Sequence, residues 1–477
     1  DNPGALIGID FDEERKLMLL NYTGQAHNFL HEIEGGWTHI LRQLRGLVVS
    51  YDGVGEGETG YFALGNHNKL RIIHDKNLFP NSLGLLYAAI TDYLGWRYNC
   101  DEGIIMGLAS YGDYSSKIPG TNKTYLDIFR DIIYVENDLD IKINLSWISF
   151  HKKRSTWVSE KFLKIFGKKR IYSNKLNKHH KNIAAGLQKR LEEIVIKQLK
   201  FLKKKYKTEY LCLAGGVALN CSLNGKISNS NIFKKIFVQP ASGDAGLSIG
   251  AAINCHLENN KKRKLNFTSN CYLGSRYTDT QIRKSIKKYR TKIKVIKTKE
   301  DIFEFTSKKL IKKKIIGWFQ DEAEFGPRAL GNRSILAIPF PKNVKDHINK
   351  KVKFRETFRP FAPAVMEEFA SKYFKINQNS EYMLIAAEVK KKMKKSISAT
   401  VHIDDTCRVQ TVNSNSNKKF YKLLKKVNEK VNIPVLLNTS FNIKGQPIVN
   451  SPDDAIKCLL KYKIDYLVIG NNIVSKT

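Results

Sequence analysis

Residues able to bind an anion are concentrated between Gly317 and Val365. A strand predicted over Ile315–Phe319 leads into two acids, a glycine–proline turn and a basic run: Glu322, Glu324, Arg328, Arg333, Lys350, Lys351, Lys353, Arg355 and Arg359. Guanidinium groups bind phosphate and other planar anions through paired hydrogen bonds, and nearby acids orient or neutralise them. Most Lys/Arg runs are solvated surface, but such runs rarely interleave with phenylalanines and prolines. The stretch therefore predicts a pocket for phosphate or another planar anion.

Two segments have the form strand, glycine turn, helix start. The strands are expected at 210–213 and 236–238, and the turns after them carry Gly215, Gly216, Asn220, Gly243 and Asp244. Backbone N–H groups and the helix dipole face outward at such turns, where they attract an anion. One glycine pair after a strand is common, but two such units in one half of a chain favour a nucleotide cleft. Asp244 adds a carboxylate at the start of the second helix.

Three further residues have side chains suited to a divalent metal. His27 and His31 are spaced i, i+4 in a helix predicted over Gln25–Ile33, so both imidazoles share one face. Asp52 follows the short apolar strand predicted at Gly46–Tyr51 and precedes alternating glycines. Imidazole and carboxylate ligands suit Fe(II) and similar ions. Taken alone, a pair of histidines at this spacing is more often an ordinary surface or core pair.

The composition limits the classes of protein that need to be considered. The 477 residues contain 42% hydrophobic residues and carry a formal charge of +36. This charge would suit a polyanionic partner, but the lysines are spread along the chain without an RNA-binding pattern of aromatic residues. The 7 cysteines are scattered without a C-x-x-C pair, which indicates free thiols in a reducing cytoplasm. No apolar run approaches the roughly 18 residues of a membrane span, and no secretion signal is recognised, so a cytoplasmic protein is expected.

Hydrophobic periodicity predicts alternating helices and strands, which indicates a mixed α/β (α+β) fold. The helices are expected at Leu83–Leu94, Asn182–Lys205, Ile302–Lys314, Phe420–Val431 and Asp453–Leu460, and later strands at Tyr382–Val389, Thr400–Val412, Val435–Asn438 and Tyr466–Gly470. Residues 113–180 give little signal and are interpreted as an insertion over the core. The polar run His256–Lys264 is the best candidate for a linker. It divides the chain into domains at 1–262 and 263–477.

Several longer segments occur in one order from about Gly46 to the C-terminus. They are YDGVGE, FPNSLGLLYAAITDYLG, GLASYG, LAGGVALNCSLNGKI, QPASGDAGLSIGAA, GWFQDEAEFGPRALGNRSILA, KVKFRETFRPFAPAV, RVQTV, PVLLNTSFNIKGQPIV and SPDDA. Together they resemble the O-carbamoyltransferase family of nodulation and antibiotic carbamoyltransferases. The resemblance implies an actin/hexokinase-type ATPase-like domain followed by a YrdC-like α/β domain. It also implies that carbamoyl phosphate and ATP form carbamoyl adenylate and pyrophosphate, after which the carbamoyl group passes to a hydroxyl of a sugar or similar acceptor.

The same resemblance assigns roles to particular residues. It implies a carbamoyl-phosphate and ATP pocket, with magnesium, formed by Lys353, Arg359, Arg408 and Lys444. Asn438 and Ser440 would donate hydrogen bonds to the adenylate, while Arg328 and Arg333 are either further clamps or structural partners of the nearby acids. In the first domain, Gly215, Gly216, Asn220 and Gly243 would bind the adenylate. His27, His31, Asp52 and Asp244 would hold iron or another divalent metal.

Some family features differ in this sequence. The family opens with an HDSS motif, but this chain has no histidine before His27, and Ile104 occupies a position that is commonly lysine. The first domain is therefore interpreted as N-terminally short, which affects the transfer step more than adenylate formation. The alternatives are a nucleotide-binding relic without transfer activity and a threonylcarbamoyl-type tRNA modifier. No membrane or nucleic-acid partner is expected, a homodimer is left open, and the acceptor cannot be read from the sequence.

Overall fold

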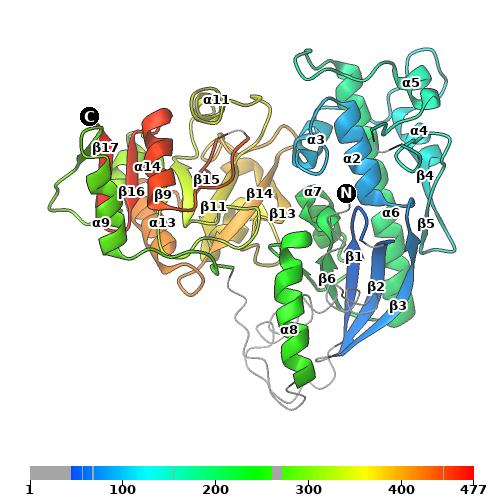
Figure 1. Ribbon diagram of the computed structural model, residues 1–477, viewed down its shortest axis with the longest axis horizontal. Helices are drawn as coiled ribbons and strands as arrows, with labels where there is room; N and C mark the ends of the chain where they lie inside the picture. Colours follow the sequence, from blue (N-terminus) through cyan, green and yellow to red (C-terminus); the bar gives the residue numbers. More distant parts are fainter. Residues whose placement is uncertain (1–44, 56, 67–68, 154, 260–270, 444) are drawn as a thin grey trace. The chain divides into compact units, whose positions relative to one another are not determined.

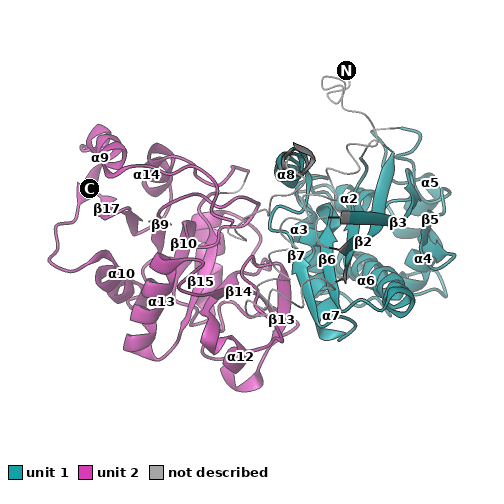
Figure 2. Ribbon diagram, turned by 90° about the horizontal axis from the view of Figure 1, so that it is seen from below, with its two compact units in different colours: residues 1–269 teal, residues 270–477 magenta. Residues whose placement is uncertain are grey.

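The computed structural model describes residues 45–55, 57–66, 69–153, 155–259, 271–443 and 445–477 (Figure 1). The chain divides into two compact units, Asp1–Ser269 and Asn270–Thr477 (Figure 2). The boundary predicted at 262/263 falls among residues 260–270, outside the described residues. Both units contain mixed sheets with helices, so the predicted mixed α/β class is confirmed.

Unit 1 is built on a five-stranded sheet with the order β3-β2-β1-β6-β7. Its strands are β1 (Arg45–Tyr51), β2 (Glu58–Asn66), β3 (Lys69–Leu78), β6 (Tyr210–Ala214) and β7 (Lys235–Val238). β2 pairs antiparallel with both β1 and β3, whereas β1, β6 and β7 pair parallel. The carboxyl ends of β1, β6 and β7 therefore meet at one edge of the sheet. The side chains of β6 are buried throughout, as expected for a strand covered on both faces.

Helices surround this sheet and a small hairpin accompanies them. The elements are α2 (Leu83–Tyr93), α3 (Glu102–Ala109), α4 (Tyr125–Ile132), β4 (Ile133–Glu136), β5 (Asp140–Ile143), α5 (Glu160–Phe166), α6 (Lys178–Tyr206), α7 (Cys221–Asn229) and α8 (Leu247–Asn259). The predicted long helix is confirmed as α6, which begins earlier than expected because Asn177 caps it. At Gly186 a Cβ would lie 2.8 Å from the ring of Phe129, so glycine allows α6 to approach α4 closely.

The chain approaches α6 closely after α3, since a Cβ on Gly112 would lie 2.1 Å from the carbonyl oxygen of Lys181. One local interpretation requires correction. The linker predicted to start at His256 is wrong for its first residues, because α8 continues through Asn259. Polar residues alone therefore do not end a helix, since they are tolerated on its solvent face. The region 113–180 is regular, with α4, β4, β5 and α5.

Unit 2 is built on a ten-stranded sheet with the order β12-β13-β14-β11-β15-β10-β9-β16-β17-β8. The strands are β8 (Ile293–Val295), β9 (Ile316–Phe319), β10 (Arg333–Ala337), β11 (Ala362–Met366), β12 (Phe374–Lys375), β13 (Ile385–Val389), β14 (Thr406–Val412), β15 (Val435–Ser440), β16 (Tyr466–Ile469) and β17 (Asn472–Lys476). The helices are α9 (Asp279–Lys288), α10 (Ile302–Ile311), α11 (Asn343–Ile348), α12 (Ala370–Tyr373), α13 (Lys418–Val431) and α14 (Pro452–Lys461).

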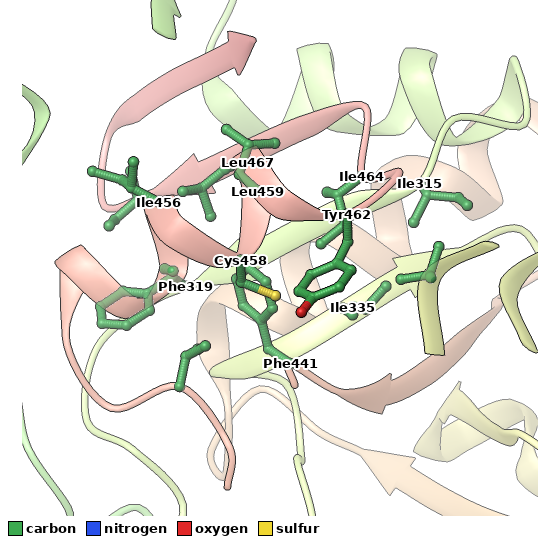
Figure 3. Packing of buried hydrophobic residues seen from close by; sticks show 14 of the residues in the cluster. Ile315, Phe319, Ile335, Phe441, Ile456, Cys458, Leu459, Tyr462, Ile464 and Leu467 are labelled. Carbon is green, nitrogen blue, oxygen red and sulfur yellow. The ribbon is translucent and has the colours of Figure 1, made fainter. Parts of the chain in front are cut away.

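The side chains of β9 show how this sheet separates two cores. Ile316 and Trp318 join a cluster with α10 and α13, whereas Phe319 joins a cluster with α9 and α14. This alternation follows from the two-residue period of a strand. Figure 3 shows the cluster that contains Phe319, in which Phe441 and Leu467 also lie. A Cβ at Gly317 would lie 2.6 Å from the ring of Phe441, so this core requires glycine there.

Among the helices in the described ranges, none combines the length and the apolar character needed to cross a bilayer.

Candidate functional site

The sheet edge of unit 1 brings five of the predicted residues together. Asp52 follows β1, Gly215 and Gly216 follow β6, and Gly243 and Asp244 follow β7. A Cβ on Gly216 would lie 3.1 Å from Oδ1 of Asp52, and one on Gly243 would lie 3.9 Å from Cα of Gly216. The three strand ends therefore converge on one point, as their parallel pairing requires.

Glycine is required at the turn that follows β6. Gly215 has a φ of +75°, and a Cβ there would lie 2.0 Å from the carbonyl oxygen of Tyr51. Any other residue would meet both backbone strain and a clash with the end of β1. This close approach leaves the next residue, Gly216, close enough for its N–H to interact with the carboxylate of Asp52.

Only one of the two oxygen atoms of the Asp52 carboxylate has a hydrogen-bond partner in the described chain. Oδ1 accepts a 2.7 Å hydrogen bond from the Gly53 N–H, while Oδ2 is buried without a hydrogen-bond partner in the described chain. Burial raises the pKa of Asp52 above its usual value; the Gly53 N–H opposes this, Asp244 adds to it, and the Gly216 N–H opposes it. Two neighbouring carboxylates, one with a buried free oxygen, fit the donor set for a divalent cation.

The other predicted metal ligands, His27 and His31, lie outside the described residues. Within the described ranges, the structure forms no group of three or more His, Cys, Asp or Glu side chains suited to a metal. The described part of the site therefore supplies two carboxylates, and the histidine part of the ligand set stays a prediction.

The raised pKa of Asp52 has a consequence for stability that can be measured. A carboxyl whose pKa is higher in the folded than in the unfolded protein contributes most to the free energy of unfolding at low pH. This contribution is lost as pH rises through the pKa of the folded state. Asparagine at position 52 does not ionise. The Tm of Asp52→Asn minus the Tm of the parental protein should therefore be more positive at pH 7 than at pH 4. Thermal unfolding with a chelator present measures this difference. The same Tm difference at both pH values would contradict the raised pKa.

The side chain of Asn220 forms hydrogen bonds inside unit 1 that give it a structural role. Its Oδ1 accepts from the Leu223 N–H at 3.0 Å, which caps α7, and its Nδ2 donates to Gln188 Oε1 at 2.8 Å. Gln188 in turn accepts from the Tyr87 hydroxyl and donates to Glu192. The amide of Asn220 is thus a member of a buried hydrogen-bond network. Its predicted contact with an adenylate remains a prediction.

In unit 2, the structure brings Lys353 to the loop after β15. Its Nζ is buried and donates to oxygen atoms of Ser440 and Asn442 at distances from 2.6 to 3.2 Å. Burial lowers the pKa of Lys353, and the positive charge of Arg355 lowers it further. Lys353 ends a short π-helical turn, and Phe354 after it is left-handed with a φ of +47°. Lys353 therefore fixes this loop and places a cation beneath it.

Three arginines join Lys353 in what we call the cationic cluster: Arg355, Arg359 and Arg408. The Arg355 guanidinium donates to Oδ1 of Asn349 at 2.7 Å and stacks over the Phe361 ring at 4.6 Å. Burial lowers the pKa of Arg355, and Arg359 and Arg408 lower it further. The arginines are therefore near enough to repel one another. Arg359 also lies 3.8 Å from Glu356, which offsets part of this repulsion.

Polar side chains of β14 and β15 lie beside the cationic cluster, and we call Gln410, Asn438 and Ser440 the polar floor. Arg408 and Gln410 share one face of β14, and Asn438 and Ser440 share one face of β15, because the residues of each pair are two positions apart. Nδ2 of Asn438 donates to Oε1 of Gln410 at 2.8 Å, while Oδ1 of Asn438 is buried without a hydrogen-bond partner in the described chain. A buried acceptor of this kind suits a donor on a ligand or an ordered water.

The glycine–proline turn before β10 is organised by Glu324. Oε1 of Glu324 accepts from the N–H groups of Leu330, Asn332 and Arg333 at 2.7, 2.8 and 3.1 Å. The side chain of Gln410 donates to the Leu330 carbonyl at 2.7 Å, which ties the turn to the polar floor. Arg328, also predicted to contact the ligand, is half-buried on this turn.

The Arg333 guanidinium is held by backbone carbonyl groups, whereas its two predicted roles were a ligand clamp and a partner of the nearby acids. Its side chain is fully buried, donates to backbone carbonyl groups of Ser275, Gln320 and Asp321, and lies over the Phe319 ring at 3.7 Å. Burial lowers its pKa to about 10. Because these bonds hold the guanidinium inside the protein, the geometry gives no support to Arg333 as a ligand clamp.

Glu324→Ala should destabilise the protein by about 2–4 kcal/mol, because three backbone donors lose one shared acceptor. Glu322→Ala in the same turn is the matched control. It removes a 3.0 Å pair with Arg276, an exposed partner, and should cost about 1 kcal/mol or less. Urea unfolding of both variants measures the difference. Equal losses of stability would contradict the organising role of Glu324.

Comparison with known proteins identifies the family. Residues 43–253 match the family described as Carbamoyltransferase N-terminus, and residues 307–476 match Carbamoyltransferase C-terminus. The Synechocystis protein sll1178, described as uncharacterized, is 36% identical over 90% of this chain and 72% of its own length. The chain belongs to the carbamoyltransferase family.

Two relatives of this carbamoyltransferase are nodulation proteins. Nodulation protein NolNO of Sinorhizobium fredii is 35% identical over 94% of this chain and 63% of its own length. Nodulation protein NolO of Bradyrhizobium diazoefficiens is 35% identical over 90% of this chain and 75% of its own length. The crystal structure of full-length HypF covers 35% of this chain at 15% identity, and its TM-score of 0.25 supports no argument.

The structure adds residues to the predicted site of this carbamoyltransferase. Gln410 and Asn442, in the polar floor and in the loop held by Lys353, were not predicted site residues. Arg355 was named in the basic run of the predicted anion pocket without a role of its own, and the structure places it in the cationic cluster. Lys444 lies outside the described residues.

Proposed function

We propose that this carbamoyltransferase forms carbamoyl adenylate in unit 2 and transfers the carbamoyl group to an acceptor hydroxyl in unit 1. The observation that carries the proposal is the cationic cluster of Lys353, Arg355, Arg359 and Arg408 beside the polar floor. Arg359 and Arg408 act on Arg355 as like charges. A bound anion would relieve this repulsion, so the cluster suits a polyanionic substrate pair.

The charges of the two substrates explain why such a cluster is needed. Carbamoyl phosphate and ATP are both anionic and repel each other, so their reaction needs fixed cations that do not have to reorganise. The balanced reaction takes up water and releases phosphate from carbamoyl phosphate and pyrophosphate from ATP, which leaves the carbamoyl group on AMP. Magnesium would accompany ATP. Asn438, Ser440 and Arg328 would orient the nucleotide from the polar floor and the adjacent turn.

The converging strand ends of unit 1 suit the transfer step. The turns at Gly215 and Gly243 would offer backbone N–H groups to the phosphate of the adenylate, while the Gly216 N–H faces the Asp52 carboxylate. Asp52 and Asp244, with His27 and His31, would hold Fe(II) or another divalent cation. Such a cation, when bound, polarises the carbamoyl carbonyl. Attack by the acceptor hydroxyl would then release AMP and a proton.

The sheet of unit 1 also supports the finer fold assignment that we propose. Its antiparallel β1–β2–β3 and parallel β1–β6–β7 arrangement is compatible with an actin/hexokinase-type domain, in which the nucleotide lies at the carboxyl ends of the parallel strands. We assign unit 2 as the YrdC-like domain because it carries the cationic cluster.

Pyrophosphate release tests the proposal. The purified chain, ATP and Mg²⁺ should release pyrophosphate only after carbamoyl phosphate is added, with one phosphate for each pyrophosphate. Formation of ADP in place of pyrophosphate, or release that does not depend on carbamoyl phosphate, would contradict adenylate formation.

A further inference from the structure

Asn349 lies at the start of the short segment that carries three members of the cationic cluster. It follows α11 and begins the π-helical turn Asn349–Lys353. Its backbone carbonyl accepts from the N–H groups of Phe354 and Arg355, the latter at 3.1 Å. These bonds close the turn and leave Phe354 with a φ of +47°, which is strained for a bulky residue. Such strain persists where the surrounding contacts impose it, and it is concentrated at functional sites.

The Asn349 side chain is 0% exposed and uses both ends of its amide within the same segment. Oδ1 accepts a 2.7 Å hydrogen bond from Nε of Arg355. Nδ2 donates to the backbone carbonyl of Arg359 at 3.1 Å and to that of Thr357 at 3.4 Å. One amide therefore fixes both the Arg355 side chain and the main chain at Arg359. Because Asn349 is fully buried, it acts on a ligand only through these neighbours.

The hydrogen-bond partners of the Arg355 guanidinium are neutral. Among the described residues, it donates to the Asn349 amide and, at 3.3 Å, to the Pro360 carbonyl. These bonds use Nε and Nη2, and Nη1 of Arg355 makes no hydrogen bond with the described residues. Arginine often pairs with a carboxylate through two parallel hydrogen bonds, and such a pair would cancel its charge. The amide instead orients the guanidinium and leaves its charge for another anion.

The charged groups near Arg355 also favour an anionic ligand. Burial lowers the pKa of Arg355 most; Arg359 and Arg408 lower it further, and Glu356 raises it by less than either arginine lowers it. Glu356 also lies 3.8 Å from Arg359. One carboxylate thus acts among three guanidinium groups, so the local field attracts an anion.

From these contacts we propose that Asn349 is a positioning residue, which fixes the Arg355 guanidinium as an available cation for a phosphoryl group of the substrates. This inference rests on the proposed function, in which the cationic cluster binds carbamoyl phosphate and ATP. Both substrates present phosphoryl oxygens, which accept from the N–H groups of a guanidinium. Asn349 has no contact with the substrate in this role and acts through Arg355.

A double-mutant cycle tests whether Asn349 acts through Arg355. Calorimetric titration of the full chain with carbamoyl phosphate alone, and separately with ATP and Mg²⁺ alone, measures affinity without turnover. Asn349→Leu keeps the size of the side chain but loses both ends of the amide, and it should weaken binding of at least one substrate about tenfold. In an Arg355→Met background the same change should weaken that binding less than about twofold, because the group that Asn349 positions is already absent.

Asn349→Asp tests whether the neutral charge of the amide matters. Aspartate keeps an acceptor for Nε of Arg355 but adds a negative charge, so it should also weaken binding about tenfold. Asp301→Ala is the control for lost stability alone, since Asp301 caps α10 by accepting from the Glu304 N–H at 2.7 Å. Its midpoint of urea unfolding should fall, because an N-cap is lost, while both affinities stay parental.

The outcomes separate this inference from the proposed function. A non-additive loss of affinity for carbamoyl phosphate, for ATP or for both supports the positioning role and identifies the phosphoryl group that Arg355 contacts. The role is overturned if either Asn349 variant binds both substrates like the parental protein, or if Asn349→Leu weakens binding equally with and without Arg355. It is also overturned if Asp301→Ala weakens binding as much, or if the parental protein binds neither substrate. A non-additive cycle in a parental protein that releases no pyrophosphate would support the positioning role and overturn the proposed function alone.

Discussion

Arg408→Met is expected to slow carbamoyl-phosphate-dependent pyrophosphate release by about 100-fold or more. Loss of one preorganised group that stabilises developing negative charge typically costs about 10²–10³ in rate. Arg408 contributes positive charge to the cationic cluster from β14, where its effect on Arg355 shows that the two guanidinium groups are close. Methionine preserves much of the side-chain length without charge. Initial rates at several concentrations of both substrates measure the effect.

The control for this prediction is Arg276→Met, also in unit 2. The Arg276 side chain is 70% exposed and pairs with Glu322 at 3.0 Å. Its replacement should change the rate less than about twofold, since an exposed pair contributes little. If the Arg408 and Arg276 variants had similar rates and both had parental melting curves, the cationic cluster would not take part in the reaction.

Asp52→Asn is expected to weaken the binding of a divalent cation by about 100-fold or more while leaving pyrophosphate release unchanged. Asparagine keeps the shape of the side chain and an acceptor for the Gly53 N–H, but it loses the negative charge that a hard cation requires. Equilibrium dialysis against Mn²⁺ measures the affinity without any need for the acceptor. Asp244→Asn should act in the same direction, since Asp244 is the neighbouring carboxylate.

Asp138→Asn provides the comparison for this metal measurement. Asp138 lies at the exposed turn before β5 with a φ of +65°, a conformation that asparagine accepts readily. Unchanged Mn²⁺ affinity in the Asp52 variant would show that these carboxylates hold no metal. Loss of pyrophosphate release in that variant would contradict the division of the two steps between the two units.

The meeting of Asp52, Gly216 and Asp244 could be anticipated from the sequence. Each residue follows an apolar strand, and the carboxyl ends of parallel strands share one sheet edge. The pattern of strands and turns thus carried most of the information about this half of the site. The His27 and His31 prediction had no such support from topology, and those residues lie outside the described ranges.

The roles of Arg333 and Asn220 could not be read from local sequence. Arg333 is held by carbonyl groups from Ser275 and Gln320, and Asn220 is held by Gln188 in a distant helix. Such partners are brought together only by tertiary packing, so a polar residue in a glycine-rich turn looks the same whether it binds a ligand or the protein itself.

The central claim is that the carbamoyl group is activated on AMP. Carbamoyl phosphate labelled with ¹³C at the carbonyl carbon, together with ATP and Mg²⁺, should give a labelled carbamoyl adenylate that mass spectrometry detects, with pyrophosphate formed alongside it. The same reaction with the Arg408→Met protein should contain little of either product. A nucleotide pool of unlabelled ADP and ATP, with the ¹³C label recovered only outside nucleotides and no pyrophosphate formed, would contradict the account.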